Sequence, residues 1–204
     1  MPTSSGQTLR DQFGDIDIYL FDQLLRGRIA PGMRMFDAGC GAGRNLVYLL
    51  RQGYEVCGND ADAAAVAQVR ARAASLSSRD HDFRVEAIEQ TSFPDDHADA
   101  VIASAVLHFA RDAAHFEAML RQMWRVLGPG GVFFARLAST IGIVTDVTAL
   151  GNGRFRLPDG SDRFLVDAAA IELWTRTLGG TLLDPIKTTV VHDQRSMTTW
   201  VAQK

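Results

Sequence analysis

The feature that most constrains this chain is a run of three alternate glycines after an apolar segment. Residues 33–38 are mostly apolar, and Gly39, Gly41 and Gly43 follow them. Glycine allows positive φ angles and leaves room for a ligand beside the backbone, because it has no Cβ. Residues 45–52 favour a helix, whose start provides free N–H groups and the positive end of the helix dipole. The sequence therefore predicts a strand, a tight turn that can hold a bulky, partly anionic ligand, and a helix.

The spacing of these glycines separates two classes of nucleotide-binding turn. A dinucleotide-binding fingerprint has the pattern G-x-G-x-x-G. Here the third glycine is Gly43 and Arg44 occupies the fingerprint position, so the pattern is G-x-G-x-G. Preceded by Asp37, this pattern resembles motif I of the class I S-adenosylmethionine-dependent methyltransferases. A glycine turn that only packs a helix against a strand is the structural alternative.

Composition is that of an ordinary globular chain. With 204 residues, 47% of them hydrophobic and 22% charged, the chain fits a single domain, residues 1–204, with a sizeable core. A net charge of −3 gives no basic excess for nucleic acid or an anionic membrane, and no apolar run suits a spanning helix. The polar residues 1–6 do not resemble a signal peptide, and Cys40 and Cys57 make no disulfide framework. We therefore expect a cytoplasmic protein.

Hydrophobic periodicity predicts alternating strands and helices along most of the chain. Strands are expected at 33–38, 54–60, 82–88, 100–104 and 132–138, and helices at 45–52, 63–76, 112–127 and 167–178. After a loose tail at 1–10, a helix at 15–26 precedes the first strand, so residues 1–32 are expected to cover the domain. Residues 181–191 and 196–202 predict a closing β-hairpin. The sequence therefore predicts an α/β fold.

The family resemblance makes that prediction more specific. It implies a Rossmann-like three-layer sandwich with a seven-stranded, mostly parallel sheet whose last strand is antiparallel, which agrees with the closing hairpin. A nicotinamide dehydrogenase usually needs a further substrate domain, and too few residues remain for one. Within the class, Gly43-Arg44-Asn45, Tyr48-Leu49 and Gly53-Tyr54 resemble the tellurite-resistance type of small stand-alone bacterial methyltransferase.

The resemblance also implies a binding site for S-adenosylmethionine. Asp37 and the backbone of residues 39–43 would hold its methionine end. Asp60 ends the predicted 54–60 strand, where a carboxylate can bind ribose hydroxyls, although a helix cap is its structural alternative. The family often has an acid and a small residue in its adenine segment, but this chain has Ala87 and Ile88, with Glu86 and Glu89 beside them. The cofactor-binding residues expected are Asp37, Ala38, Gly39, Cys40, Gly41, Gly43, Asn45, Asp60, Ala61, Ala87, Ile88 and Ser104.

Three residues are candidates for contact with the methyl acceptor. His108 belongs to a leucine-histidine pair that often follows the fourth strand in this family, near the reactive end of the cofactor. It can act as a general base or position the substrate, and a histidine bonded within its own loop is the alternative. Arg136 is a charge near the end of an apolar strand and can bind an anionic group or pair with an acid. Tyr19, on the N-terminal helix, can reach a ligand or serve packing alone.

Residues 139–166 form an irregular, glycine-punctuated segment that is expected to lie over the pocket and shape substrate choice. A small hairpin is predicted, in which residues 154–157 pair with 163–166 around Pro158-Asp159-Gly160. This segment contains several arginines, but the rest of the chain has no excess of basic residues. Nucleic acid is therefore not expected as a partner. The acidic residues at 95–99 lie in a turn, where ligands would splay apart, so no metal site is expected.

These observations favour S-adenosylmethionine-dependent methyl transfer to a small-molecule acceptor. The cofactor is intrinsically reactive, so such a protein mainly aligns the acceptor with the methyl group. Two alternatives remain: a non-catalytic domain that binds S-adenosylmethionine or S-adenosylhomocysteine, and a dinucleotide-binding enzyme. The sequence does not identify the acceptor or the oligomeric state.

Overall fold

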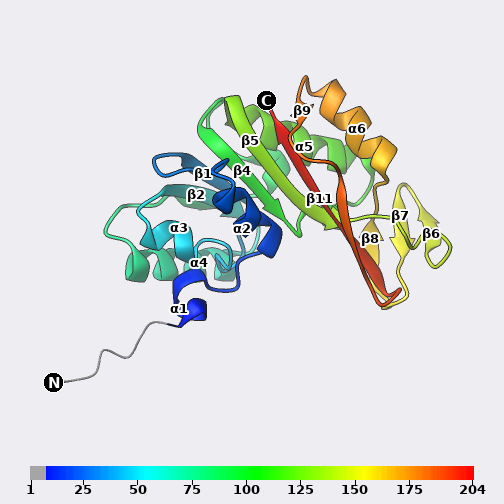
Figure 1. The fold of residues 1–204 in the computed structure, drawn as a ribbon, viewed down its shortest axis with the longest axis horizontal. Coiled ribbons are helices and arrows are strands. Elements are labelled where there is room, and N and C mark those ends of the chain that lie inside the picture. Colours follow the sequence, from blue (N-terminus) through cyan, green and yellow to red (C-terminus); the bar gives the residue numbers. More distant parts are fainter. Residues whose placement is uncertain (1–7) are drawn as a thin grey trace.

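The computed structural model describes residues 8–204, which form an α/β fold around one large sheet (Figure 1). Its strands are β1 (Arg34–Ala38), β2 (Glu55–Asp60), β3 (Phe83–Val85), β4 (Ala98–Ser104), β5 (Leu127–Ala138), β9 (Thr181–Leu182), β10 (Lys187–Val191) and β11 (Arg195–Gln203). They follow the order β10-β11-β5-β4-β1-β2-β3, and β9 pairs with β11. Strands β1 to β5 are parallel, whereas β11 runs antiparallel to both of its main neighbours, β5 and β10.

This topology confirms the predicted fold class, including the antiparallel last strand. The seven-stranded path gains a short eighth strand because the predicted 181–191 strand is interrupted between β9 and β10. Pro185 lies in the interruption and has no N–H to donate to a neighbouring strand. Asp184, beside it, is buried and bound by Arg28 at 2.7 Å, so the break also anchors the segment before β1.

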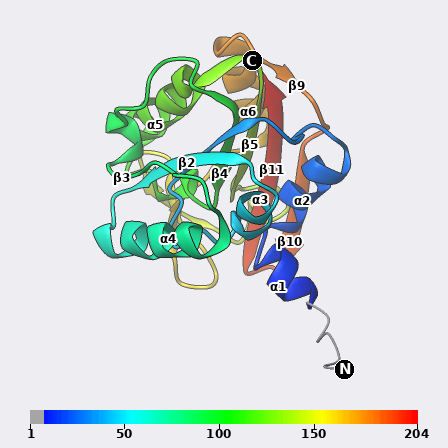
Figure 2. The same cartoon turned by 90° about the vertical axis from the view of Figure 1, so that its left-hand side faces the viewer.

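Helices cover both faces of the sheet, as Figure 2 shows. They are α1 (Leu9–Phe13), α2 (Ile18–Leu25), α3 (Val47–Arg51), α4 (Ala63–Leu76), α5 (Ala113–Val126) and α6 (Ala168–Thr177). Buried side chains of α5 and α6 belong to one core cluster, and those of α2, α3 and α4 belong to a second. Asp62, Asp112 and Asp167 cap α4, α5 and α6 by accepting backbone N–H groups, which fixes where these helices begin.

The strand order positions the functional region. The chain leaves β1 towards β2 and β3, and then returns to form β4 on the other side of β1. Connections that leave neighbouring strands in opposite directions open a crevice at the carboxyl ends of those strands. Gly39 follows β1 and Ala105 follows β4, so both residues lie at this crevice.

The segment before β1 differs from its prediction. The predicted helix at 15–26 is shorter, and α1 contradicts the loose tail at residues 9 and 10, while residues 1–7 lie outside the described part. A capping box explains α1, because Thr8 and Asp11 each accept the other's backbone N–H. The next predicted helix, at 45–52, begins only at Val47, because Asn45 belongs to the turn before it.

The predicted hairpin in residues 139–166 is present, but it has a third strand. β7 (Arg154–Arg156) pairs antiparallel with β8 (Asp162–Phe164), and β6 (Thr148–Gly151) pairs with β7. β6 has no buried residues, so it has no alternation of apolar and polar positions that would reveal it. The predicted 82–88 strand ends at Val85, and a 3-10 turn, η1 (Ile88–Gln90), follows.

We expect Gly43→Ala to destabilise the protein more than Gly53→Ala. Both glycines have similar positive φ angles, +74° and +75°, so both substitutions carry a left-handed backbone cost of about 1–2 kcal/mol. An added Cβ at Gly43 would lie 2.6 Å from Val69 Cγ2, whereas at Gly53 no atom lies within 4 Å. Overpacking should therefore lower the free energy of unfolding of Gly43→Ala by about a further 1–3 kcal/mol in urea denaturation. Equal losses in the two variants would contradict this packing.

Candidate active site

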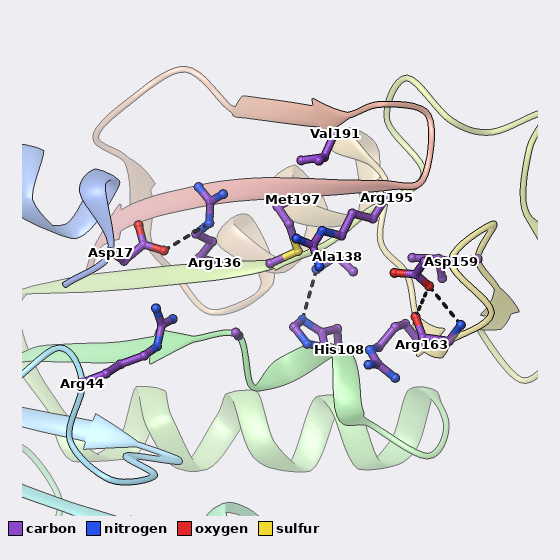
Figure 3. A pocket seen from close by; sticks show the side chains of 13 residues that line it. Asp17, Arg44, His108, Arg136, Ala138, Asp159, Arg163, Val191, Arg195 and Met197 are labelled. Atoms are coloured by element: carbon purple, nitrogen blue, oxygen red, sulfur yellow. Dashed lines mark hydrogen bonds and ion pairs between the residues drawn. The ribbon is translucent and has the colours of Figure 1, made fainter. Parts of the chain in front are cut away.

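Two cavities meet at the carboxyl ends of the parallel strands, and Ala105 lines both. The glycine-turn cavity has a volume of about 390 Å³ and is lined by Gly39, Asp60, Ala61, Ala87, Ile88, Glu89, Ala105, Val106, Phe109, Arg111, His115 and Met119. The arginine cavity, shown in Figure 3, has a volume of about 430 Å³ and is lined by Asp17, Arg44, Ala105, His108, Arg136, Ala138, Leu157, Asp159, Ser161, Arg163, Val191, Arg195 and Met197.

Ala105 marks the junction between the cavities. Its φ angle is +65°, which is uncommon for a residue with a Cβ, and its N–H donates to the carbonyl oxygen of Arg136 at 2.7 Å. The bond ties the end of β4 to β5 in this conformation. The residue that the two cavity walls share thus contributes only a methyl side chain.

The predicted glycine turn is present and is braced by Asp60. Gly39, Gly41 and Gly43 have φ angles of +67°, +51° and +74°. The N–H groups of Gly41 and Asp62 donate to the two carboxylate oxygens of Asp60, each at 2.9 Å. The Asp60 carboxylate therefore holds the turn against the end of β2 and also forms part of the cavity wall.

Asp37 is buried at the end of β1, beside the glycine turn. Burial raises the pKa of its carboxyl to about 7, the positive charge of Arg44 opposes the rise, and the negative charge of Asp60 adds to it. A nearby cation would favour the ionised form of this group. Asp37 is therefore a carboxyl whose charge can respond to a cationic ligand near neutral pH.

Glu89 supplies an acid at the wall where the predicted adenine segment lacks one. It lies on η1 and lines the glycine-turn cavity. His115 Nε2 lies 3.0 Å from its Oε1, and Arg111 Nη2 lies 3.6 Å from the same oxygen. Glu86, the other acid beside Ala87, instead accepts the N–H and hydroxyl of Ser92. Glu89 is thus the acid that faces the cavity.

His108 lies in the 3-10 turn η2 (Leu107–Phe109) after β4 and is buried. Its Nδ1 accepts the backbone N–H of Ala138 at 3.3 Å, so the neutral ring carries its proton on Nε2. Burial lowers the pKa of His108 to about 4, with the charge of Arg163 as a second cause. At neutral pH this imidazole is an N–H donor to the arginine cavity and not a charged group.

Arg136 is paired rather than free. Its Nε lies 3.1 Å from Asp17 Oδ2, and its guanidinium lies 4.5 Å from the centre of the Tyr19 ring. The Tyr19 hydroxyl is 2.6 Å from the hydroxyl of Thr189 on β10, so Tyr19 supports Arg136 and does not itself line the cavity. One buried nitrogen of Arg136, Nη1, has no hydrogen-bond partner among the described residues. Arg136 therefore lines the cavity as part of an ion pair, with one buried donor that no described group accepts.

Arg44 and Asn45 follow the glycine turn and have different partners. Arg44 Nη2 donates to the hydroxyl of Ser104 at 2.8 Å, and Arg44 lines the arginine cavity. Asn45 Oδ1 accepts the backbone N–H of Asp17 at 2.9 Å. The segment before α2 is therefore tied to the glycine turn through Asn45, while Arg44 keeps its charge at the cavity.

The structure brings only part of the predicted cofactor set to a cavity wall. Gly39, Asp60, Ala61, Ala87 and Ile88 line the glycine-turn cavity. The other predicted residues lie in or behind the turn and the strand ends: Asp37, Ala38, Cys40, Gly41, Gly43, Asn45 and Ser104. Burial also raises the pKa of the Cys40 thiol, which keeps it protonated and a poor nucleophile. The cofactor contacts of all these residues stay predictions.

Several charged or titratable residues of the cavity walls carry no role in the sequence-based prediction, among them Glu89, Arg111, His115, Arg163 and Arg195. His115, on α5, lines the glycine-turn cavity next to Glu89. Arg195 lies at the start of β11, whose pairing with β5 places it beside the cavity. Motif spacing gives no signal for it, because its position depends on the register of two distant strands.

Neither a metal site nor a membrane-spanning helix is found among the described residues. Among residues 8–204, no three His, Cys, Asp or Glu side chains are grouped as a metal site. In the 95–99 cluster, Asp95 lies 2.7 Å from Arg125 and Asp96 lies 2.8 Å from Lys204, so these acids have separate cationic partners. Within the same range, no helix has the length and apolar character that crossing a bilayer requires.

Comparison with known proteins places this architecture in a family. A model of the methyltransferase domain matches residues 36–135, the span from β1 to β5 that contains the glycine turn, Asp60 and both ends of the crevice. The matched span and the fold identify the chain as a member of the class I S-adenosylmethionine-dependent methyltransferases.

Individual relatives differ in what they are named for. The ubiquinone biosynthesis O-methyltransferase of Methylocella silvestris is 38% identical over 116 residues, which cover 55% of this chain and 44% of that protein. The tRNA 5-carboxymethoxyuridine methyltransferase of Escherichia coli is 25% identical over 182 residues, 84% of this chain and 69% of that protein. A Methanosarcina mazei S-adenosylmethionine-dependent methyltransferase has a solved structure with a TM-score of 0.72 and 19% identity, covering 89% of this chain and 96% of that chain. The chain thus spans less than half of the Methylocella relative, and the solved structure supports the fold alone.

We expect His108 to make the protein less stable in mild acid. Between pH 6.5 and 4 the unfolded chain protonates this histidine and the native state does not, so the free energy of unfolding falls as pH falls. The shift from 6.5 to about 4 corresponds to about 3 kcal/mol. Urea denaturation across this range should show that the free energy of unfolding falls by this additional amount in the unsubstituted protein. His108→Gln, which cannot titrate at this position, should not show the additional fall. Parallel pH dependences would contradict the lowered pKa.

Proposed function

We propose that this protein transfers a methyl group from S-adenosylmethionine to a small molecule bound in the arginine cavity. The observation that carries the proposal is the junction at Ala105, where a nucleoside-sized cavity beside a motif I turn meets a second cavity with polar walls. Such an arrangement suits two ligands that must react with each other. Family membership supports the choice of cofactor.

The residues of the glycine-turn cavity fit the adenosine part of that cofactor. Asp60 would accept hydrogen bonds from the ribose hydroxyls, and Ile88 and Val106 provide apolar walls for adenine. Glu89 would accept a hydrogen bond from the exocyclic amine of adenine. Glu89 would thus supply the contact to adenine for which the family often has an acid at the position of Ala87.

The methionine end has suitable charged partners beside the glycine turn. Asp37 would attract its ammonium group, and Arg44 would bind its carboxylate. When bound, the cofactor supplies an electrophilic methyl group on a sulfonium, and an acceptor atom that bonds to this carbon displaces the sulfur as a thioether with the bonding electron pair. The protein's part is to hold the acceptor in line with that bond and to exclude water.

His108 would act in this reaction as a hydrogen-bond donor that positions the acceptor. Its Nδ1 lone pair is used by Ala138 and its Nε2 already carries a proton, so it has no free site to take a proton from the acceptor. Of the two roles that the sequence leaves open, the geometry favours positioning over general base catalysis. Acceptors that are already anionic, or that lose a proton readily to water, match such a site.

We expect the affinity for S-adenosylmethionine to rise with pH through neutrality. The ionised form of Asp37 attracts the cofactor's ammonium group, and a pKa of about 7 makes that form scarce at pH 6 and dominant at pH 8. If only the ionised form binds, the dissociation constant falls about tenfold over this range. Calorimetric titrations of the native protein and Asp37→Asn would measure this, and an equal pH dependence in the two proteins would exclude the role of Asp37.

A second acceptor class, tRNA, is favoured by one observation. The Escherichia coli relative named for a tRNA substrate aligns over 84% of this chain. The surface of residues 139–166 supports it less, because Arg156 is paired with Asp162 and the chain carries a net charge of −3. Incubation with radiolabelled S-adenosylmethionine and either total tRNA or a small-molecule extract would separate the two acceptor classes by where the label appears.

The first test of the proposal is calorimetric titration with S-adenosylmethionine, S-adenosylhomocysteine and NAD. We expect the first two to bind and NAD not to bind. Asp60→Asn should weaken binding about 10- to 100-fold, because a hydrogen bond to a charged group contributes about 1.5–3 kcal/mol. Asp62→Asn is the matched control: it removes a neighbouring charge outside the cavity, and asparagine caps α4 equally well.

Three outcomes would count against the proposal. Binding of NAD alone would favour a dinucleotide-binding enzyme. If none of the three ligands binds, the protein has the fold of the family but not its cofactor chemistry. Binding of S-adenosylmethionine with no transfer to either acceptor pool would favour the non-catalytic binding domain.

A further inference from the structure

We propose that the molecule accepted in the arginine cavity is a small organic acid, whose carboxylate or phosphate group is bound by Arg163 and Arg195. This inference rests on the proposed function and adds the chemical class of the acceptor. It is carried by the balance of charge in the cavity wall, by the engagement of the other two arginines, and by the apolar surface between the charges.

The wall of the arginine cavity carries an excess of positive charge. Four arginines and two aspartates line it, and His108, with a pKa of about 4, adds no charge at neutral pH. The whole chain has the opposite sign, with a net charge of −3. The excess is therefore local to the cavity and is not a reflection of overall composition.

Two of the four arginines already have a use. Arg136 is paired with Asp17, and this pair is neutral as a whole. Arg44 donates to Ser104 at the end of β4, where the proposed cofactor's carboxylate would take its charge. Figure 3 shows Arg44 and Arg136 towards one end of the view and Arg163 and Arg195 towards the other.

Arg163 and Arg195 have no carboxylate partner. Among residues 8–204, neither guanidinium lies within the 4.0 Å of a carboxylate oxygen that defines an ion pair. Arg163 donates instead to the carbonyl oxygen of Asp162 at 2.8 Å and lies 4.9 Å from the centre of the Phe109 ring. Neither a carbonyl nor an aromatic ring removes its positive charge. The guanidinium groups of both residues therefore remain able to bind an anion.

Asp159 reduces the excess without cancelling it. Its carboxylate accepts the N–H and hydroxyl of Ser161, at 2.9 and 2.6 Å, and these bonds lower its pKa, with Arg163 and Arg195 as lesser causes. One negative charge between two positive ones leaves a net charge of +1 at this end of the cavity. A single anionic group on the acceptor would complete the balance.

The remaining wall describes the rest of the acceptor. Leu157, Val191 and Met197 contribute apolar surface to the same cavity, whose volume of about 430 Å³ is in the range of small-molecule sites. A compact apolar body with one anionic end fits this combination. With the anion held by Arg163 and Arg195, the acceptor atom would lie towards Ala105 and the junction with the glycine-turn cavity.

The test is a binding comparison on the full-length protein loaded with S-adenosylhomocysteine. The probes are benzoate, phenyl phosphate and benzamide, which share a ring and differ in charge and in the anionic group. Chemical-shift titration of the ¹⁵N-labelled protein gives each dissociation constant. We expect at least one anionic probe to bind about tenfold or more tightly than benzamide, less so at high salt, because an arginine–anion hydrogen bond is charge-assisted. Benzoate against phenyl phosphate tells a carboxylate acceptor from a phosphorylated one.

Variants then assign the anion site. Arg163→Gln and Arg195→Gln should each reduce the preference for the anionic probe, and the double variant should abolish it. Arg176→Gln is the matched control, since it removes one positive charge from an exposed position on α6, 68% exposed and remote from the cavity wall. The comparison of the three probes at low and high salt uses only the unsubstituted protein. It therefore tests the preference for an anion even if a variant fails to fold.

Two results would overturn the inference: equal binding of the neutral and anionic probes, or an anion preference that Arg163→Gln and Arg195→Gln alter no more than Arg176→Gln does. Either result, in a protein that binds S-adenosylhomocysteine, refutes the acceptor class and leaves the proposed function intact. Failure to bind S-adenosylhomocysteine refutes the proposed function itself, because that ligand is expected in the other cavity.

Discussion

The carboxylate of Asp60 joins the two parts of the chain that make the glycine-turn cavity. It accepts the N–H groups of Gly41 and Asp62, so the same side chain fixes the turn after β1 and the start of the chain beyond β2. Three glycines of the turn have left-handed φ angles. Because glycine adopts many backbone conformations, a loop with these glycines needs further contacts to hold a single conformation. A charge-assisted bond to the centre of the turn therefore sets the position of Gly39, and with it the shape of the wall of the glycine-turn cavity.

Asp17 has a comparable position for the arginine cavity. Its backbone N–H is bound by Asn45, just after the glycine turn, and its carboxylate is bound by Arg136 on β5. The segment before α2 is thus held by two elements that also form the crevice. Its closeness to the cavity follows from these bonds, and the Tyr19–Thr189 contact extends the attachment to β10. The chain before β1 is in this way a structural part of the cavity wall.

Much of this arrangement can be predicted from the sequence, because it depends on local pattern. Alternate glycines after an apolar run and an acid at the end of the next strand are signals of short range, and they predict the turn and the place of Asp60. The contact of Glu89 with His115 at the cavity wall depends instead on the early end of β3, which sequence periodicity extends to residue 88. The charge state of His108 depends on burial and on the charge of Arg163, and its tautomer depends on one backbone N–H from β5. No spacing rule in the sequence contains these contacts.

The net charge of the chain and the charge of the arginine cavity have opposite signs, and they bear on different kinds of ligand. A net charge of −3 argues against a polyanion spread over the surface, because such binding needs a broad basic face. It gives no information about a cavity, since a few side chains from distant segments decide the charge there. Arg44, Arg136, Arg163 and Arg195 come from a turn, a central strand, a hairpin and the last strand, and only the sheet order brings them together. An acidic protein can therefore present a basic cavity, and a sulfonium cofactor in the neighbouring cavity would add to the attraction for an anionic acceptor.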